Sequence, residues 1–244
     1  MDITFKGKQV LVTGAGKGIG FGIAKRLSQY GAKVIALSRT EDDLKKLKQE
    51  APGVETVCID ISDWTTTREA ISKLPAIDCL VNNAGIAICA PFLEASPEDF
   101  DKIFNINVKA IVNISQVVAK QMIDRGKGGS IVNVSSQASQ AALADHALYG
   151  SSKSAVDMLT KVMALELGPH NIRVNSVNPT VTMTDMARVG WSEPNKADAM
   201  RAKIPLRRFA EVHEVVDAIV YLLSDKSSMI NGVTLPVDGG FLAS

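Results

Sequence analysis

The amino-acid sequence predicts a single α/β domain: a doubly wound, seven-stranded parallel sheet with helices on both faces. Short apolar runs rich in Val, Ile and Leu recur along the chain, and longer segments of helical periodicity separate them. This alternation is typical of parallel strands that are buried on both faces and connected by helices. A glycine-rich turn follows the first apolar run directly. The 244 residues are 46% hydrophobic and contain no repeat or linker, so they suffice for one large core.

The first strand and the turn after it have the features of a nucleotide site. A buried strand at residues 9–13 runs into the glycine-rich segment 14–20, and a helix follows with Ile23, Ala24 and Leu27 turned inward. This arrangement presents backbone N–H groups and a helix N-terminus to a pyrophosphate, which can approach because glycine has no Cβ. The spacing TGxxxGxG differs from the commoner GxGxxG, so the position directly after a strand carries the prediction.

The second strand indicates which dinucleotide would bind. It covers residues 33–37 and ends at Ser38-Arg39-Thr40, where an NAD site has an acidic residue for the ribose 2′-hydroxyl. Arg39 cannot accept that hydrogen bond, but its planar guanidinium suits a 2′-phosphate, and Lys17 could add a second positive charge. We therefore expect NADP(H) rather than NAD(H). The alternative is that both cations are only solvated surface residues.

Two further strands of the first half end in polar residues. After a helix at 44–49, strand 55–59 ends at Asp60, which could reach an adenine amino group. Alternatively, Asp60 or Ser62 caps the next helix. The fourth strand begins at Asp78 and ends in Asn82-Asn83-Ala84-Gly85, an abrupt polar turn. Open parallel sheets bind ligands at the carboxyl ends of their strands.

The second half contains the candidate catalytic residues. A helix is expected over 104–122, and Asn107 inside it needs partners for its amide, either from the main chain or in a site. A strand at 131–136 ends with the hydroxyl of Ser136, which could hydrogen-bond a carbonyl or alcohol oxygen. The next helix, 149–168, has Tyr149 and Lys153 on one face.

These two side chains suit proton transfer. An ammonium near the phenol is expected to lower its pKa from the ordinary value of about 10. That shift would bring Tyr149 toward the range in which acid–base catalysis is efficient. A YxxxK spacing alone is common, so the interpretation depends on a cofactor site around it.

The last part of the chain completes the sheet. Strand 173–177 brings Asn178-Pro179-Thr180 to the same edge as the other polar turns. Segment 184–209 has large apolar groups in a polar background, and it either covers an apolar-lined pocket as a lid or packs on the body. Helix 211–224 and strand 233–237 follow.

Composition limits the remaining classes of function. The net charge of +1 gives no sign of a nucleic-acid-binding surface. Cys58, Cys79 and Cys89 lack metal-ligand or disulfide spacing, and we expect three buried thiols, no metal ion and a reducing, cytoplasmic location. The sequence shows neither a signal peptide nor an apolar run long enough for a membrane span. The acidic residues 41–43 are expected in the first turn of a helix.

Taken in order, these motifs resemble the short-chain dehydrogenases/reductases over essentially the whole chain. The matching motifs are Thr13-Gly14-x-x-x-Gly18-x-Gly20, Asn82-Asn83-Ala84-Gly85, Asn107, Ser136, Tyr149-x-x-x-Lys153 and Asn178-Pro179. Thr180 departs from the family, which most often has glycine there. The resemblance implies one Rossmann-fold domain over residues 1–244, with the cofactor half at about 1–130 and the substrate lid at about 184–209.

The resemblance also implies a catalytic tetrad. Tyr149 would protonate a carbonyl oxygen as the nicotinamide delivers hydride to its carbon, and Lys153 would bind the nicotinamide ribose and lower the pKa of the tyrosine. Ser136 would orient the substrate oxygen, and Asn107 would hold a water that links Lys153 to solvent. The implied cofactor-binding residues are Gly14, Lys17, Gly18, Ile19, Gly20, Ser38, Arg39, Thr40, Asp60, Ile61, Asn83, Ala84, Gly85, Tyr149, Lys153, Pro179, Val181 and Thr184.

Within the family, the loops are most similar to those of carbonyl reductases that use NADPH and act as homotetramers. This likeness includes Ser38-Arg39-Thr40, Leu167-Gly168-Pro169-His170 and the segment 239–243. It implies a ketose or α-dicarbonyl substrate, as in the reduction of L-xylulose to xylitol or of diacetyl. The implied substrate-binding residues are Ser136, Gln137, Leu143, His146, Tyr149, Trp191 and Met200.

Other functions remain open at this point. A reductase of 3-oxoacyl carriers or steroid ketones would keep every catalytic residue and differ only in segments 137–148 and 184–209. Four basic residues in the second segment would suit an acidic carrier protein: Arg188, Lys196, Arg201 and Lys203. A non-catalytic NADP-binding protein is disfavoured because Tyr149 and Lys153 are both present. An extended epimerase would need a second substrate domain.

Overall fold

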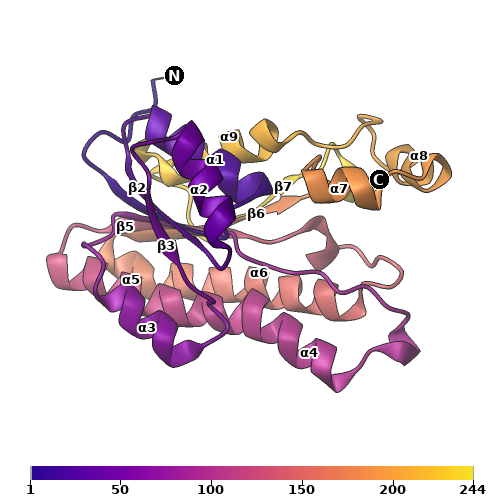
Figure 1. Ribbon diagram of the computed structural model, residues 1–244, viewed down its shortest axis with the longest axis horizontal. Coiled ribbons are helices and arrows are strands. Elements are labelled where there is room, and N and C mark those ends of the chain that lie inside the picture. The colour runs from indigo at the N-terminus through magenta and orange to yellow at the C-terminus, as the bar shows by residue number, and fades with distance from the viewer. Residues whose placement is uncertain (1, 244) are drawn as a thin grey trace.

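Seven parallel strands form the centre of the molecule, as the sequence predicts (Figure 1). The computed structural model describes residues 2–243, so the first and last residues of the predicted domain lie outside the described range. Within this range the sheet order is β3-β2-β1-β4-β5-β6-β7. The chain therefore builds outward from β1 in one direction and then from β4 in the other, which leaves a ligand-binding crevice at the carboxyl ends of β1 and β4. The strands are β1 (Gln9–Thr13), β2 (Lys33–Ser38), β3 (Glu55–Cys58), β4 (Cys79–Asn82), β5 (Gly129–Val134), β6 (Ile172–Pro179) and β7 (Thr234–Val237).

Helices cover both faces of this sheet (Figure 1). One layer contains α1 (Gly18–Gln29), α2 (Glu41–Glu50) and α9 (Val212–Leu223), and the other contains α3 (Trp64–Ser72), α4 (Pro97–Phe104), α5 (Ala110–Arg125) and α6 (Ala147–Leu167). Because strand side chains alternate between faces, β1 contributes to two cores. Val10 and Val12 pack with the first layer, whereas Leu11 packs with the second. The continuous apolar runs are explained by this double burial.

The helix expected at 104–122 begins earlier and is interrupted. Helix α4 starts at Pro97, because the hydroxyl of Ser96 accepts a hydrogen bond from the Asp99 N–H at 3.1 Å. A π-turn over Asn105–Lys109 then separates α4 from α5. The expected start was wrong because the first two turns of α4 are largely polar, which hides them from a search for apolar periodicity.

Two smaller predictions also need correction. Strand β5 ends at Val134, so Ser136 lies in the turn that follows it, next to a 3-10 turn at Gln137–Ser139. The N-cap of α3 is neither Asp60 nor Ser62 but Asp63, whose carboxylate accepts the Thr66 N–H at 2.7 Å. The acidic residues 41–43 do lie in the first turn of α2, as expected.

Segment 184–209, here called the lid, is more regular than expected. It contains α7 (Asp185–Gly190) and α8 (Pro194–Ala202), and its two ends meet in a parallel bridge between Thr182 and Ala210. A small apolar cluster joins the lid to the body. Its lid members are Ala197, Met200, Ile204, Phe209 and the partly buried Trp191, and its body members are the partly buried Val181, Met183 and Phe241. The lid thus has a closed base and shares a small core with the residues next to it.

The cysteines are not all buried. Cys79 is buried on β4, but Cys58 and Cys89 are exposed. Cys58 ends the edge strand β3, which has no neighbour on its outer side, and Cys89 lies in the loop after β4. Among the described helices, none combines the length and apolar character that a membrane crossing requires. Within residues 2–243, no three His, Cys, Asp or Glu side chains gather as a metal site would need.

Candidate active site

The glycine-rich turn forms a cradle at the carboxyl end of β1. Gly14 and Gly18 have φ of 65° and 55°, in the left-handed region that favours glycine. A Cβ on Gly14 would lie 2.8 Å from Cα of Ala84, and one on Gly20 would collide with the Gly14 carbonyl. Lys17 precedes α1 without a side-chain cap, and the first turn of α1 has no acidic residue. This helix N-terminus is therefore available to an anion.

The turn after β4 is fastened to this cradle. The Asn83 amide donates to the carbonyls of Thr13 at 3.0 Å and Gly14 at 3.1 Å. In return, the Thr13 hydroxyl accepts the N–H groups of Asn83 and Ala84 at 3.0 and 3.1 Å. These bonds hold Asn83 and Ala84 against the glycine turn, at the carboxyl end of β4 where the sequence places this polar turn.

The residues predicted to bind the 2′-phosphate follow β1 and β2, and Asp60, predicted to reach the adenine, follows β3. Arg39 is exposed. The pKa of Asp60 is lowered, first by the hydrogen bond that its carboxylate accepts from the Ser62 N–H at 2.9 Å and also by the charge of Arg39. Lys17 is paired: its ammonium lies 3.2 Å from the buried Asp43 carboxylate, while most of its side chain remains in solvent. Asp43 was not singled out from the sequence. Lys17 therefore forms a salt bridge with an acidic residue of α2.

Lys153 and Tyr149 lie together on α6, as predicted. The Lys153 ammonium lies 5.7 Å from the centroid of the Tyr149 ring and donates to the Val134 carbonyl at 2.8 Å. Lys153 is only 4% exposed, and burial lowers its pKa to about 8, against the opposing charge of Asp157.

The pKa of Tyr149 is shifted in the direction opposite to the prediction. Burial raises it, and hydrogen bonding with Ser136 opposes the rise. The sequence argument considered only the charge of Lys153 and not the removal of the phenol from water. In this protein desolvation dominates, so the phenol keeps its proton near neutral pH.

Asn107 is fully buried in the π-turn. Its amide oxygen accepts the Ile86 N–H at 2.9 Å, and its Nδ2 donates to the Ile86 carbonyl at 2.9 Å and to the Ser152 hydroxyl at 3.0 Å. A Cβ on Gly85 would lie 3.2 Å from Oδ1 of Asn107 and 3.4 Å from Nζ of Lys153. Asn107 therefore holds the turn after β4 through main-chain bonds, which is one of the two interpretations left open by the sequence, and it reaches α6 through the Ser152 hydroxyl.

Three of the predicted substrate residues precede Tyr149 in the sequence: Gln137, Leu143 and His146. The His146 ring meets the Tyr149 ring edge-on with 6.1 Å between centroids. Its Nδ1 lies 2.6 Å from the Ala144 carbonyl, and its Nε2 lies 3.5 Å from Sγ of Cys89. The main chain of His146 is bonded to Leu143. Gln137 is buried beside Ser136, and its Oε1 has no partner among the described residues.

The other two predicted substrate residues belong to the lid. Met200 is buried in the lid cluster, and Trp191 packs on Phe209 with 5.4 Å between ring centroids. The lid begins close to the cofactor cradle, since a Cβ on Gly18 would lie 2.9 Å from Cγ2 of Thr184. Thr184 also caps α7. Placing Trp191 and Met200 on the substrate remains a prediction.

Thr180 is accommodated without strain. Its backbone is not among the described residues with positive φ, so this position does not require glycine. Its N–H donates to the Val237 carbonyl at 3.2 Å, and its buried hydroxyl has no partner among the described residues. The departure from the family pattern therefore leaves the backbone intact beside Pro179 and Val181.

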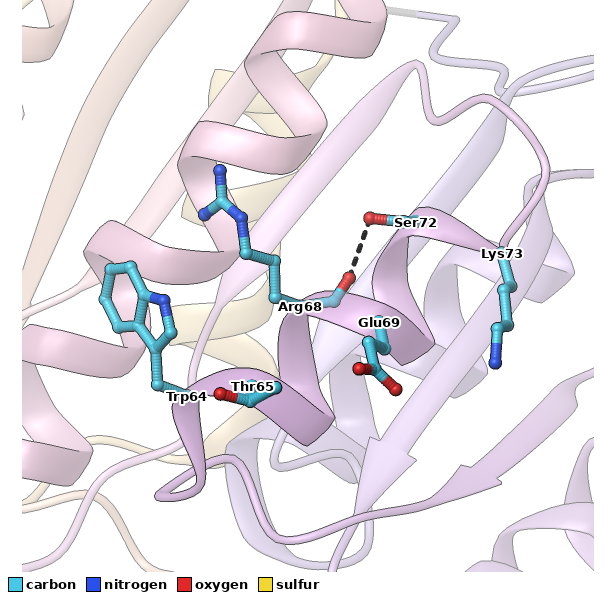
Figure 2. A pocket seen from close by; sticks show the side chains of 6 residues that line it. All are labelled: Trp64, Thr65, Arg68, Glu69, Ser72 and Lys73. Carbon is cyan, nitrogen blue, oxygen red and sulfur yellow. Dashed lines mark hydrogen bonds between the residues drawn. The ribbon is translucent and has the colours of Figure 1, made fainter.

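Two surface hollows lie outside this group of residues. Figure 2 shows one of about 440 Å³ along α3, with the side chains of Trp64 and Arg68 toward one end and Lys73 at the other. The second, of about 490 Å³, lies between the lid and α9 and is lined by Met183, Arg201, Arg208, Phe209, Glu211, His213 and Glu214. Neither is lined by a predicted catalytic or cofactor residue.

Known proteins match this chain along its full length. The sequence model of a family described as Enoyl-(Acyl carrier protein) reductase matches residues 14–242. The chain is 58% identical over 244 residues to the L-xylulose reductase of Mesocricetus auratus and 50% identical over 244 residues to the carbonyl reductase (NADPH) 2 of Sus scrofa, each match covering 100% of both chains.

Solved structures show the same fold. A gluconate 5-dehydrogenase from Burkholderia cenocepacia, in complex with NADP and tartrate, has a TM-score of 0.93 at 32% identity, covering 99% of this chain and 97% of that chain. The glycine turn lies directly after β1, and Tyr149 and Lys153 lie one turn apart on α6, as the sequence motifs predict. The chain belongs to the short-chain dehydrogenase/reductase family of oxidoreductases.

Proposed function

We propose that this protein is an NADPH-dependent carbonyl reductase that transfers hydride to a ketose or an α-dicarbonyl, with the reduction of L-xylulose to xylitol as its principal reaction. The observation that carries the proposal is the gathering of a protonated phenol, a buried amine and the Ser136 hydroxyl beside the glycine cradle. The 58% identity to an L-xylulose reductase supports the choice of substrate.

The cradle fits a dinucleotide. Side chains at Gly14, Gly18 and Gly20 would fill it, and the N-terminus of α1 has no capping side chain. We assign the pyrophosphate to the N–H groups of residues 14–20. Ser38, Arg39, Thr40 and Lys17 take the 2′-phosphate, and Asp60 and Ile61 take the adenine. Asn83 to Gly85, Pro179, Val181 and Thr184 complete the cofactor half at about residues 1–130 and its junction with the lid.

The catalytic roles follow from the charge states. Bound NADPH would supply the hydride. Tyr149 holds its proton on Oη, because burial raises the pKa of the phenol, and donates it to the substrate oxygen. Lys153 is charged near neutral pH and stabilises the phenolate that remains. Ser136 orients the oxygen, and Asn107 holds the water that returns a proton through Lys153.

The polar lining favours a hydroxylated substrate. With its Nδ1 proton directed to the Ala144 carbonyl, His146 offers Nε2 as an acceptor, and Oε1 of Gln137 has an unused lone pair. Both can accept hydrogen bonds from the hydroxyls of a ketose. Leu143, Trp191 and Met200 supply apolar walls. An unpaired acceptor in a buried site disfavours a purely apolar ligand, such as a steroid.

The acyl-carrier alternative receives less support. Arg201 pairs with Asp198, Arg188 lies 3.9 Å from Glu211, and Lys196 lies over the Trp191 ring at 5.0 Å. The charges of Arg201 and Arg188 thus lie next to carboxylates, whereas Lys196 and the exposed Lys203 keep their positive charge, so the basic surface offered to an acidic carrier is reduced to two lysines.

We further propose a cytoplasmic homotetramer. Helix α6 exposes Met158, Val162 and Leu165, with Leu165 78% exposed, and Phe92 and Leu93 are exposed before α4. Apolar side chains that recur at helical spacing on a surface are typical of a subunit interface. Three free thiols among the described residues support a reducing compartment.

The function is tested by the initial rate of NADPH oxidation by purified protein with L-xylulose, with NADH in parallel and xylitol measured as product. We expect rapid turnover with NADPH, little with NADH, and turnover slower by roughly 10²–10⁴-fold with the Tyr149→Phe variant. If NADPH binds but neither L-xylulose nor diacetyl is reduced, the substrate proposal is wrong. Turnover of a 3-oxoacyl thioester instead would select the alternative.

A further inference from the structure

A buried carboxylate lies one helical turn beyond Lys153. Asp157, on α6, is 8% exposed. Its Oδ2 accepts from the Ser139 hydroxyl at 2.6 Å and from the Asn178 amide at 2.8 Å, and its Oδ1 lies 3.4 Å from the Ser176 hydroxyl. These donors come from the turn after β5 and from β6. They satisfy a charge that would otherwise be strongly unfavourable in the interior.

Two of these donors also hold the main chain of Ser136. The Ser139 hydroxyl lies 2.7 Å from the Ser136 carbonyl, and the Asn178 amide lies 3.2 Å from it. A hydroxyl has one proton and an amide has two, so Asn178 can serve both oxygens at once while Ser139 serves one. Asp157 therefore anchors the Asn178 amide, which can also donate to the Ser136 carbonyl, while the single Ser139 proton is shared between Asp157 and that carbonyl. The Ser136 hydroxyl, on the same residue, is the one that hydrogen-bonds with Tyr149.

Asp157 also acts on Lys153. The two residues are four apart on one face of α6. The negative charge raises the pKa of the ammonium, against the burial that brings it down to about 8. The other groups that face Lys153 are Tyr149 on the same helix, the Val134 carbonyl from β5, and Gly85 and Asn107 from the turns opposite. Of these four, Tyr149 is the one that titrates.

We infer that Asp157 is a positioning residue of the active site: it holds Ser136 in place through Ser139 and Asn178, and it keeps Lys153 charged from the same helix face. Its kinetic consequence rests on the proposed carbonyl reduction. Its electrostatic consequence belongs to the ligand-free protein, so the two can be tested apart.

The first experiment needs no substrate. Lysine labelled with ¹³C at Cε is titrated by NMR in the wild type and in Asp157→Asn, with the Lys153 signal assigned by its loss in Lys153→Arg. Removing an opposite charge on the next turn is expected to lower the pKa of Lys153 by about one unit. Asp124→Asn, an exposed carboxylate on α5 paired with Lys120, is the matched control and should leave the Lys153 signal unchanged. An unchanged titration in Asp157→Asn overturns the electrostatic part.

The second experiment uses kinetics to separate the effect of Asp157 on Ser136, called the positioning arm, from its effect on the charge of Lys153. Ser139→Ala removes a hydroxyl that contacts both the Ser136 carbonyl and Asp157 but keeps the charge of Asp157. We therefore expect kcat to fall about 10-fold, the NADPH dissociation constant to stay the same, and the Lys153 titration to move less than in Asp157→Asn. Asp157→Asn should lower kcat at least as much and move the alkaline limb of kcat/KM to lower pH. If Ser139→Ala keeps kcat within twofold, the positioning arm is wrong. If the wild type reduces no ketone, the proposed function fails, and the NMR titration still decides the inference.

Discussion

Lys153 donates a hydrogen bond to the main-chain carbonyl of Val134, with 2.8 Å between its Nζ and the oxygen. The amine is thereby fixed at the carboxyl end of β5, 5.7 Å from the centroid of the Tyr149 ring. A buried ammonium of this kind is unfavourable for folding but useful in catalysis. The first two predictions follow from this position.

Replacing Lys153 by methionine should stabilise the fold while removing activity. The pKa of Lys153 lies at about 8 in the folded protein, below the ordinary lysine value of 10.5. Below about pH 8 both states bind the proton, and the folded state bears the full penalty of burying it; as pH rises from 8 toward 10.5 this penalty disappears. At pH 7, Lys153→Met should therefore raise the unfolding free energy, on the order of 1 kcal/mol, as measured by urea denaturation. Lys120→Met, at an exposed site, is the control, and a destabilised Lys153→Met would contradict the argument.

Activity in the reductive direction should fall as pH rises through the pKa of Lys153. Only the charged amine stabilises the phenolate that Tyr149 becomes, so the alkaline limb of kcat/KM for the ketose should lie near pH 8. The measurement is a pH–rate profile with NADPH held at saturation. A rate that stays flat up to pH 10 would remove Lys153 from this role.

Removing the Tyr149 hydroxyl should abolish most turnover and leave cofactor binding intact. Positioned acid catalysis contributes roughly 10²–10⁴-fold, so Tyr149→Phe should lower kcat by a factor in that range. NADPH binding, followed by quenching of protein fluorescence, should be unchanged within about twofold. Near-normal turnover in this variant would show that the phenol is not the proton donor.

The choice of NADPH over NADH should depend more on Arg39 than on Lys17. Lys17 is already paired with Asp43 at 3.2 Å, whereas Arg39 is exposed at the end of β2. Arg39→Ala should raise KM for NADPH by about 10-fold or more, because one charge-assisted contact to the phosphate is lost. Lys17→Ala should have a smaller effect. Lys25→Ala, whose charge is paired with Glu50 on the surface, is the control, and a larger effect of Lys17 would reverse this assignment.

Asn107 should be needed for stability as well as for activity. Its side chain satisfies both the N–H and the carbonyl of Ile86, and Asn107→Ala would leave these groups without partners. A fully buried unsatisfied group costs about 1–3 kcal/mol, and the Ile86 groups are only partly buried, so a loss of about 1–3 kcal/mol in total is expected in urea denaturation. Asn195→Ala, at an exposed position on α8, should change stability by less than about 0.5 kcal/mol.

The sequence was sufficient to predict the strands of the sheet and the polar residues that follow their carboxyl ends. The inner strands β1, β2 and β4 are short apolar runs because both of their faces are buried, and such runs can be recognised without knowing their neighbours. Tyr149 and Lys153 could be paired because helical spacing alone puts them on one face. The glycine turn was recognisable because only glycine permits that approach of backbone to backbone.

Other features depend on contacts that no local pattern contains. Asp157 was missed although it lies four residues after Lys153, because its partners Ser139 and Asn178 come from separate segments. The rise in the pKa of Tyr149 depends on burial by the whole site, and the start of α4 depends on a capping serine rather than on apolar periodicity. Cys58 was expected to be buried, yet its exposure follows from β3 standing at the sheet edge, which only the strand order reveals.

The bridge between Thr182 and Ala210 has a consequence for how such enzymes diversify. Because the two ends of the lid are already joined by the Met183–Ala210 and Ala210–Val181 hydrogen bonds, at 2.8 and 3.0 Å, the body of the protein fixes its closure whatever lies between. The apolar cluster of the lid is completed by Val181, Met183 and Phe241, which belong to the body. We therefore expect a relative's segment grafted between these two residues to close at the same place when its apolar side chains pack on these three body residues.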